Sequence, residues 1–396
     1  MNTPTCIYCG KAGPFSDEHV FSAGLGGDDQ RFMLKDLVCE QCNTKTFSKL
    51  EAKMMRESAP ALARIYLQPQ GRGSGKKASK PKLNAPVNEM QNPETGYWME
   101  SDLGPGGEPF VLPQLIMVPE GISPIGPDLD ALQSFIQRLS DILGTQVQIV
   151  NKQQADHGHN FMVTTLNWSD DKYEISTEEN CTKPPKQAIW IERQSKRPPE
   201  NEARIFHREG GNIVLRVHSP ERAHLWLTYV KLHLPDIQVS QPHKQGKIDQ
   251  PDMHIGMLHN DDAYMRVLAK IGMNLAIHTY GSDYCRHSAF DNIKGIILTG
   301  KPSVVWSIDN ASLKSVLSQI GGDHHAMMLA PHKNSDSDYS LLFVIRLYGG
   351  PVHVVQLAAG HLPKPPIELP MFFSVNYVSH SIKQIELPEL ASKDIC

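Results

Sequence analysis

The chain of 396 residues contains no apolar run that approaches the ~20 residues of a membrane-spanning helix. Its first residues also lack the basic start and apolar stretch of a secretory signal. We therefore expect no membrane span and, by default, a cytoplasmic protein. Internal repeats and coiled-coil heptads are missing as well, which excludes repeat and coiled-coil architectures. The length instead favours two or three globular domains.

Cysteine is scarce and unevenly placed. Four of the seven cysteines form two Cys-x-x-Cys pairs near the N-terminus, Cys6 with Cys9 and Cys39 with Cys42. The scattered remainder are Cys181, Cys285 and Cys396. This clustering favours a metal site in a reducing compartment over a disulfide framework. Four thiolates are what a tetrahedral structural zinc needs, and zinc supplies folding free energy that a unit of about 60 residues cannot obtain from its core alone.

A net positive charge is found only at the start of the chain. The net charge is −4, yet residues 1–85 carry thirteen Lys and Arg against eight Asp and Glu, or +5, which leaves −9 for the remainder. Residues 61–90 form a basic linker rich in Pro, Gly and Ser, with Arg72, Lys76, Lys77, Lys80 and Lys82. The linker is either a solvated connection or a phosphate clamp, and a polyanion is expected to bind to this part of the chain.

The 29 residues between Cys9 and Cys39 exceed the spacing of a simple zinc ribbon, so further structure is inserted there. We expect a strand over residues 15–21, a glycine loop over 24–27 and a returning strand over 34–38. A helix then opens after Cys42 and buries Phe47, Leu50 and Met54. Two strands and a helix, joined by zinc, are predicted.

Glu51 lies on this helix close to its apolar face, and no residue three or four positions away can pair with its charge. Asp17, Glu18 and His19 are expected across from it. Two carboxylates and an imidazole of pKa near 7 are what metal-assisted phosphodiester hydrolysis needs. Side chains alternate along a strand, so Glu18 and His19 share one site only if the strand bends, and otherwise Asp17 replaces Glu18 as the ligand.

Four short motifs resemble the HNH endonuclease superfamily, in the subgroup with a four-cysteine zinc site. They are Cys-Ile-Tyr-Cys-Gly at 6–10, Asp-Glu-His-Val at 17–20, Leu-Gly-Gly at 25–27 and Cys-Glu-Gln-Cys-Asn at 39–43. The resemblance covers about 60 of 396 residues and implies a ββα-metal fold. It implies that His19 is the general base, Glu18 a metal-binding acid, Asn43 the brace of the loop that carries the base, and Glu51 the final metal ligand.

Two departures from the family pattern modify this interpretation. Glu51 stands where many HNH sites have histidine or asparagine, which favours Mg²⁺ or Mn²⁺ over zinc at the catalytic position. Ser22 stands where proline is frequent. Glu51 could also be an ordinary exposed acid, and Asn43 only the cap of its helix.

Beyond the module we expect a larger mixed α+β region of unknown fold over residues 91–396, divided into subdomains 91–250 and 251–396 if it is not one unit. Hydrophobic spacing predicts helices at 129–143, 264–275 and 288–300. Alternating or β-branched runs predict strands at 147–149 and 213–217, and a meander at 325–329, 341–347 and 352–357. The clusters Asp323-His324-His325 and His157 with His159 lack partners at ligand spacing, so a second metal site is not favoured.

These patterns predict an α+β protein with an N-terminal endonuclease that hydrolyses phosphodiester bonds, with DNA as the favoured substrate. Nucleic-acid contacts are assigned to Lys45, Lys49, Arg72, Lys76, Lys77 and Lys80. The large companion region suggests regulation, by a partner protein or in a homo-oligomer, as in bacterial anti-phage defence, by analogy alone. The alternatives are a zinc-dependent nucleic-acid-binding or scaffold protein with a vestigial site, and a zinc module that binds only protein.

Overall fold

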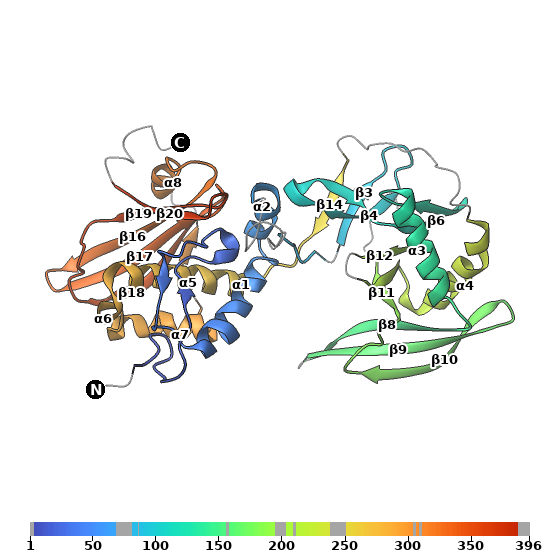
Figure 1. Cartoon of the computed structure of the whole chain (residues 1–396), viewed down its shortest axis with the longest axis horizontal. Helices are drawn as coiled ribbons and strands as arrows, with labels where there is room; N and C mark the ends of the chain where they lie inside the picture. Colours follow the sequence, from blue (N-terminus) through green and yellow to red (C-terminus); the bar gives the residue numbers. More distant parts are fainter. Residues whose placement is uncertain are drawn as a thin grey trace. The chain divides into compact units, whose positions relative to one another are not determined.

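A computed structural model describes residues 4–68, 81–85, 87–155, 158–194, 203–208, 211–237, 251–303, 306–308 and 311–386. The chain divides into two compact units, whose elements are labelled in Figure 1. The terminal unit comprises Met1–Pro86, Pro105–Gly107 and Met257–Cys396, and the middle unit comprises Val87–Gly104 and Glu108–Gly256. The N-terminal module therefore groups with the last third of the chain.

The N-terminal module contains the predicted pair of strands and the predicted helix. Its elements are β1 (Glu18–His19), η1 (Ala23–Leu25), β2 (Met33–Leu34), η2 (Gln41–Phe47), α1 (Ser48–Met54) and α2 (Ala59–Leu67). The two strands are antiparallel, with Glu18 opposite Leu34, and a single bridge joins Phe15 to Cys39. The regular ladder is much shorter than the predicted strands over 15–21 and 34–38, although backbone hydrogen bonds from Ser16 to Val38 and from Val20 to Phe32 continue the antiparallel arrangement.

The rest of the terminal unit is a helical layer and an antiparallel sheet. The helices are α5 (Asp261–Tyr280), α6 (Ser282–Cys285), η7 (Ser288–Phe290), α7 (Asp291–Thr299) and α8 (Ala311–Leu317). The sheet has the order β15-β18-β17-β16-β19-β20, with β15 (Trp306–Ile308), β16 (His324–Ser335), β17 (Asp338–Arg346), β18 (Val352–Leu362), β19 (Met371–Asn376) and β20 (Ser381–Ile385). The predicted helix at 264–275 and the predicted meander are both confirmed.

Helix α5 is the centre of this unit. Fifteen of its 20 residues are buried, and the side chain of Asn260 caps its first turn by accepting a hydrogen bond from the Ala263 amide. One hydrophobic core includes Phe47 and Met54 of the module, residues of α5, and Phe343 of the sheet. The module therefore has no separate core and folds against α5, which brings residues more than 200 positions apart into contact.

The middle unit is built on two sheets. The larger has the order β10-β9-β8-β11-β13-β12-β6-β7 and the smaller β14-β3-β4-β5. These strands are β3 (Val87–Gln91), β4 (Trp98–Leu103), β5 (Pro109–Val111), β6 (Gln114–Val118), β7 (Gly121–Ile125), β8 (Gln146–Ala155), β9 (Gly158–Ser169), β10 (Lys172–Cys181), β11 (Ile189–Arg193), β12 (Ala203–His207), β13 (Ile213–Val217) and β14 (Met253–Gly256).

Two helices, α3 (Leu129–Ile142) and α4 (Ala223–His233), accompany these sheets. The predicted helix at 129–143 and the strands at 147–149 and 213–217 are confirmed. The chain is thus a mixed α+β protein with several sheets. Within the described residues, no helix has the length and apolar character that a bilayer crossing requires.

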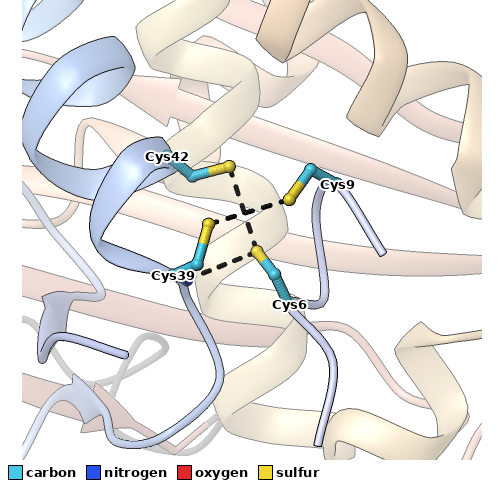
Figure 2. Close-up of side chains that lie close together, drawn as sticks. All are labelled: Cys6, Cys9, Cys39 and Cys42. Atoms are coloured by element: carbon cyan, nitrogen blue, oxygen red, sulfur yellow. Dashed lines mark hydrogen bonds between the residues drawn. The ribbon is translucent and has the colours of Figure 1, made fainter. Parts of the chain in front are cut away.

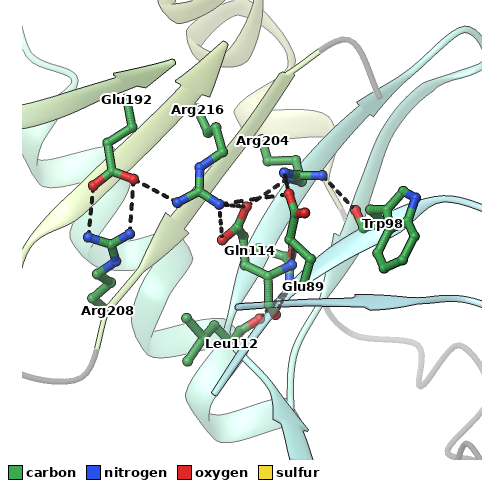
Figure 3. Close-up of polar contacts among 9 residues, drawn as sticks. Glu89, Trp98, Leu112, Gln114, Glu192, Arg204, Arg208 and Arg216 are labelled. Atoms are coloured by element: carbon green, nitrogen blue, oxygen red, sulfur yellow. Dashed lines mark hydrogen bonds and ion pairs between the residues drawn. The ribbon is translucent and has the colours of Figure 1, made fainter. Parts of the chain in front are cut away.

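A buried network of charges joins the two sheets of the middle unit (Figure 3). Glu100 of β4, with 2% of its side chain exposed, accepts hydrogen bonds from Arg204 of β12 at 2.9 Å and from Arg216 of β13 at 2.8 Å. Arg204 also pairs with Glu89 of β3, and Arg216 pairs with Glu192 of β11 at 2.6 Å. These five charged residues all come from strands, with β3 and β4 in the smaller sheet and β11, β12 and β13 in the larger, so the network fixes one sheet against the other.

Candidate functional site

The four N-terminal cysteines converge, as the zinc prediction requires (Figure 2). Their sulfur atoms all lie within 4.8 Å of one another. The Sγ atoms of Cys6 and Cys42 are 3.9 Å apart and those of Cys9 and Cys39 are 3.7 Å apart. A tetrahedral zinc about 2.3 Å from each sulfur separates the sulfurs by about 3.8 Å, so the cluster could hold such a structural metal.

Local hydrogen bonds prepare this cluster for a cation. The backbone amide of Cys39 donates to Cys6 Sγ at 3.4 Å. The hydrogen bond with Cys42, opposed by burial and assisted by backbone amides, lowers the pKa of the Cys6 thiol to about 4. A thiolate is the form that binds zinc. The residues present therefore fit a structural zinc ion.

The glycine loop that follows β1 is held in place through its carbonyl groups. Arg64 Nε of α2 donates to Gly24 O at 2.8 Å, and the ring of His325 on β16 bonds Leu25 O at 3.0 Å. Gly26 adopts a φ of +89°, and a Cβ there would lie 2.5 Å from the backbone of Tyr377. Only glycine fits this position. The loop is thus anchored to α2, to β16 and to the backbone of Tyr377.

Glu18 of β1 and Glu51 of α1 lie on either side of the side chain of Lys270 of α5. The sequence patterns did not indicate this lysine. The Lys270 Nζ atom pairs with Oε1 of Glu18 and lies 2.5 Å from Oε1 of Glu51. The Lys270 side chain is 1% exposed, Glu18 5% and Glu51 20%. Glu51 is therefore not an ordinary exposed helix acid.

The ionisation of these groups follows from their burial and contacts. Burial alone would lower the pKa of Lys270, but the charges of Glu18 and Glu51 and hydrogen bonds to both raise it above its ordinary value. Burial also raises the pKa of Glu51, yet Lys270, the Ser22 hydroxyl and His19 together bring it below the ordinary value. For Glu18, burial dominates and the pKa is raised. The lysine therefore stays protonated at neutral pH.

A second residue of α5, Asn274, fixes the strand that carries Glu18 and His19. Its Nδ2 donates to Glu18 Oε1 at 3.1 Å and to the backbone carbonyl of His19 at 2.9 Å. Its Oδ1 accepts a hydrogen bond from Tyr8, which lies in the first zinc knuckle. Lys270 and Asn274 are one helical turn apart, so one face of α5 holds both the acid pair and the strand.

His19 lies on the more exposed side of β1. Its Nε2 is 3.6 Å from Oδ1 of Asp28, with 16% of the side chain exposed. The charge of His19 also contributes, less than Lys270 and Ser22, to the lowered pKa of Glu51. Glu18 faces α5, while the imidazole lies nearer the surface.

Of the other predicted residues, Asn43 lies where a brace is expected. Its Nδ2 donates to the Asp17 carbonyl at 2.8 Å and to Ser16 Oγ at 3.1 Å, and the helical segment begins two residues earlier, at Gln41. The Asp17 side chain is exposed. Ser22 Oγ donates to Glu51 Oε1 at 2.6 Å. The serine that stands where proline is frequent in the family therefore supplies a hydrogen bond to the acid pair.

The basic residues are only partly described. Lys45 and Lys49, four residues apart on η2 and α1, are exposed. Arg72, Lys76, Lys77 and Lys80 lie outside the described residues. His157 also lies outside the described residues, and His159 is part of β9. Within the described ranges, the four cysteines form the only group of three or more potential ligands close enough to hold a metal ion.

His325 is completely buried beneath the glycine loop and is neutral there. Burial lowers the pKa of His325 to about 3, whereas the unfolded chain titrates near 6.5. The unfolded state therefore binds a proton that the folded state rejects, and stability is lost as the pH falls from 6.5 towards 3. We expect His325 to contribute a slope of about 1.4 kcal/mol per pH unit in this interval.

Chemical denaturation between pH 7 and 4.5 measures this slope. The variant His325→Gln should be less stable at pH 7, because it alters contacts to Leu25 and Tyr348, yet lose free energy less steeply on acidification. Exposed His332, replaced with Gln, should keep the full wild-type slope. An unchanged slope in His325→Gln would contradict the assignment.

Lys270 and Asn274 could have been recognised as unusual from the sequence, because a lysine and an asparagine stand four residues apart inside an apolar helix. Their partners, however, could not be identified, since Glu18 and Glu51 lie more than 200 residues earlier.

Comparison with protein-family models, with curated proteins and with solved structures finds no match for this chain. The resemblance to HNH nucleases therefore rests on the short motifs of the first 51 residues alone.

Proposed function

We propose that the N-terminal module hydrolyses phosphodiester bonds in nucleic acid, with DNA as the favoured substrate. The observation that supports this most strongly is the convergence of Glu18 and Glu51 on one atom, Lys270 Nζ, with a partly exposed histidine next to Glu18 on the same strand. The charge of His19 also helps to lower the pKa of Glu51. A histidine able to accept a proton from water, beside an acidic centre, is an arrangement suited to hydrolysis.

Each residue has a role in this proposal. His19 removes the proton from the attacking water, and Asp28, 3.6 Å from Nε2, favours the imidazolium that results. Asn43 keeps the strand in position through the Asp17 carbonyl. Exposed Lys45 and Lys49 contact phosphate groups, which gives salt-sensitive binding without base specificity. Structural zinc on the four cysteines holds the knuckles together.

The predicted Mg²⁺ or Mn²⁺ does not fit the acid pair as it is folded. A divalent ion between Glu18 and Glu51 needs their facing oxygen atoms, and these atoms already contact Lys270. No catalytic step is therefore assigned to such an ion.

The neutralised acid pair also favours a second candidate function. In this alternative the module is a zinc-dependent nucleic-acid-binding or scaffold domain whose hydrolytic site is vestigial. Such a protein keeps the salt-dependent affinity expected from Lys45 and Lys49 but does not cleave.

Replacement of His19 with Ala distinguishes the two functions. Nicking of supercoiled plasmid by the zinc-loaded full chain is expected to fall by a factor of about 10² to 10⁴, the usual contribution of a general base. DNA binding, measured by fluorescence anisotropy at two salt concentrations, should be unchanged. Assays with single-stranded DNA and RNA define the substrate.

Exposed His332, replaced with Ala, is the matched control, since it lies on β16 away from the module's acids and should leave cleavage intact. Equal nicking by wild type and His19→Ala would reject His19 as the base. Binding without any cleavage by the wild type would support the vestigial alternative.

A further inference from the structure

The position between Glu18 and Glu51 has a complete set of donors. Glu18 Oε1 accepts from Lys270 and from Asn274, and Glu51 Oε1 accepts from Lys270 and from Ser22. Each facing oxygen therefore has two hydrogen-bond donors, which matches its two lone pairs. No further ligand is needed to satisfy these oxygen atoms.

The ammonium group also meets the electrostatic need of the site. Two buried carboxylates without a cation would repel one another and lose their hydration, which is unfavourable. Lys270, with a side chain 1% exposed, lies at hydrogen-bond distance from both. It also stands 5.4 Å from the centre of the Phe47 ring, whose face favours a cation. The local net charge of the three groups is −1 instead of −2.

The backbone that carries Lys270 is firmly fixed. Residues on both sides of it, Ala269 and Ile271, are fully buried, and α5 packs along α1. Gly272 lies so close to the sheet that a Cβ would stand 2.6 Å from the ring of Phe343. A lysine on so rigid a helix cannot withdraw without unpacking the core of the unit.

We propose that the Lys270 ammonium permanently takes the place of the divalent cation at the acid pair, as an internal counter-ion supplied by the C-terminal part of the same unit. Lys270 is thus a positioning residue for Glu18 and Glu51, and the folded chain does not bind Mg²⁺ or Mn²⁺ there. The role of Lys270 in hydrolysis rests on the proposed function. The claim that the acid pair binds no divalent ion does not depend on it.

Binding of Mn²⁺ to the zinc-loaded full chain tests the proposal, with free Mn²⁺ followed by its electron paramagnetic resonance signal. Wild type and Glu51→Gln are expected to give the same Mn²⁺ isotherm, because the acid pair takes no ion in either. Lys270→Met, which keeps the side-chain length without the charge, is expected to gain one Mn²⁺ site per chain. Lys270→Met combined with Glu51→Gln should lose that site again.

Lys294→Met is the matched control. Lys294 is another buried lysine of this unit, 3.6 Å from Asp291, and its loss should create no Mn²⁺ site. Because Lys270→Met leaves two buried acids unpaired, its melting temperature should rise on addition of Mn²⁺, while that of the wild type stays constant. Lys270→Gln, which retains a hydrogen-bond donor, serves as the second variant if Lys270→Met does not fold.

The proposal would be overturned if the wild type bound one Mn²⁺ ion and the Glu51→Gln variant did not. This comparison requires no variant of Lys270. Absence of a new site in folded Lys270 variants would overturn it as well. Cleavage assays separate this result from the proposed function. If the wild type cleaves, cleavage should persist without added Mg²⁺ or Mn²⁺, and if it does not cleave, the Mn²⁺ isotherms still decide the role of Lys270.

Discussion

Replacement of Cys39 with Ser is expected to abolish zinc binding and to unfold the N-terminal module. A structural zinc contributes on the order of 10 kcal/mol to the folding of small zinc domains at neutral pH. Cys39 is one of four sulfur atoms within 4.8 Å of one another, and a serine hydroxyl is a poor replacement for a thiolate ligand. The ion should be lost completely rather than held by three sulfurs.

On loss of zinc, the module is expected to lose less of its structure than an isolated zinc domain would. Phe47 and Met54 belong to a core shared with α5, and Tyr8 donates to Asn274 on the same helix. These contacts keep part of the module attached to the unit. We therefore expect local unfolding around the knuckles and β1, while the sheet of the terminal unit remains folded.

Metal analysis and amide hydrogen exchange measure this outcome. Zinc should fall from one atom per chain to none, and the amides of the two knuckles and of β1 should exchange faster by several orders of magnitude, with little change in β16–β18. Cys181→Ser is the control, because Cys181 lies in the middle unit outside the cluster. A zinc-free Cys39→Ser chain with wild-type protection over 4–68 would show that the metal is dispensable for folding.

Local structure was predictable where one pattern dominated. The thiolate cluster followed from the spacing of Cys6, Cys9, Cys39 and Cys42, and α3, α5 and the meander followed from hydrophobic period. The short ladder of β1 and β2 did not: the regular pairing covers only two residues of each strand, although Ser16 and Val20 still donate backbone hydrogen bonds to Val38 and Phe32 across it. The spacing of hydrophobic residues predicts which face of an element is buried. It does not predict which distant element packs against that face.

Glu51 shows this limit most clearly. Its neighbours within the helix offered no partner for its charge, so a cation was inferred, and a cation is indeed beside it. The cation is Lys270, 219 residues away. Local sequence can establish that a charge needs a partner, whereas the choice between a metal ion and a lysine depends on tertiary packing.

The largest loss of stability in the middle unit is expected from Glu100→Gln. Glu100 lies between Arg204 and Arg216, each with 1% of its side chain exposed, and supplies the negative charge closest to both. Although burial raises the pKa of Glu100, the two guanidinium groups oppose this effect. Loss of its charge leaves two buried cations with only Glu89 and Glu192 to compensate, and breaking a buried pair in this way costs about 3–5 kcal/mol.

Tryptophan fluorescence can follow this unfolding selectively, because four of the five tryptophans, Trp98, Trp168, Trp190 and Trp226, belong to the middle unit. Glu174→Gln is the control: Glu174 pairs with Lys172 at 2.6 Å, but both side chains are more than half exposed. An exposed pair contributes little to stability, so at similar distances the two variants isolate the effect of burial. If Glu100→Gln and Glu174→Gln shift the urea midpoint equally, the network does not hold the two sheets together.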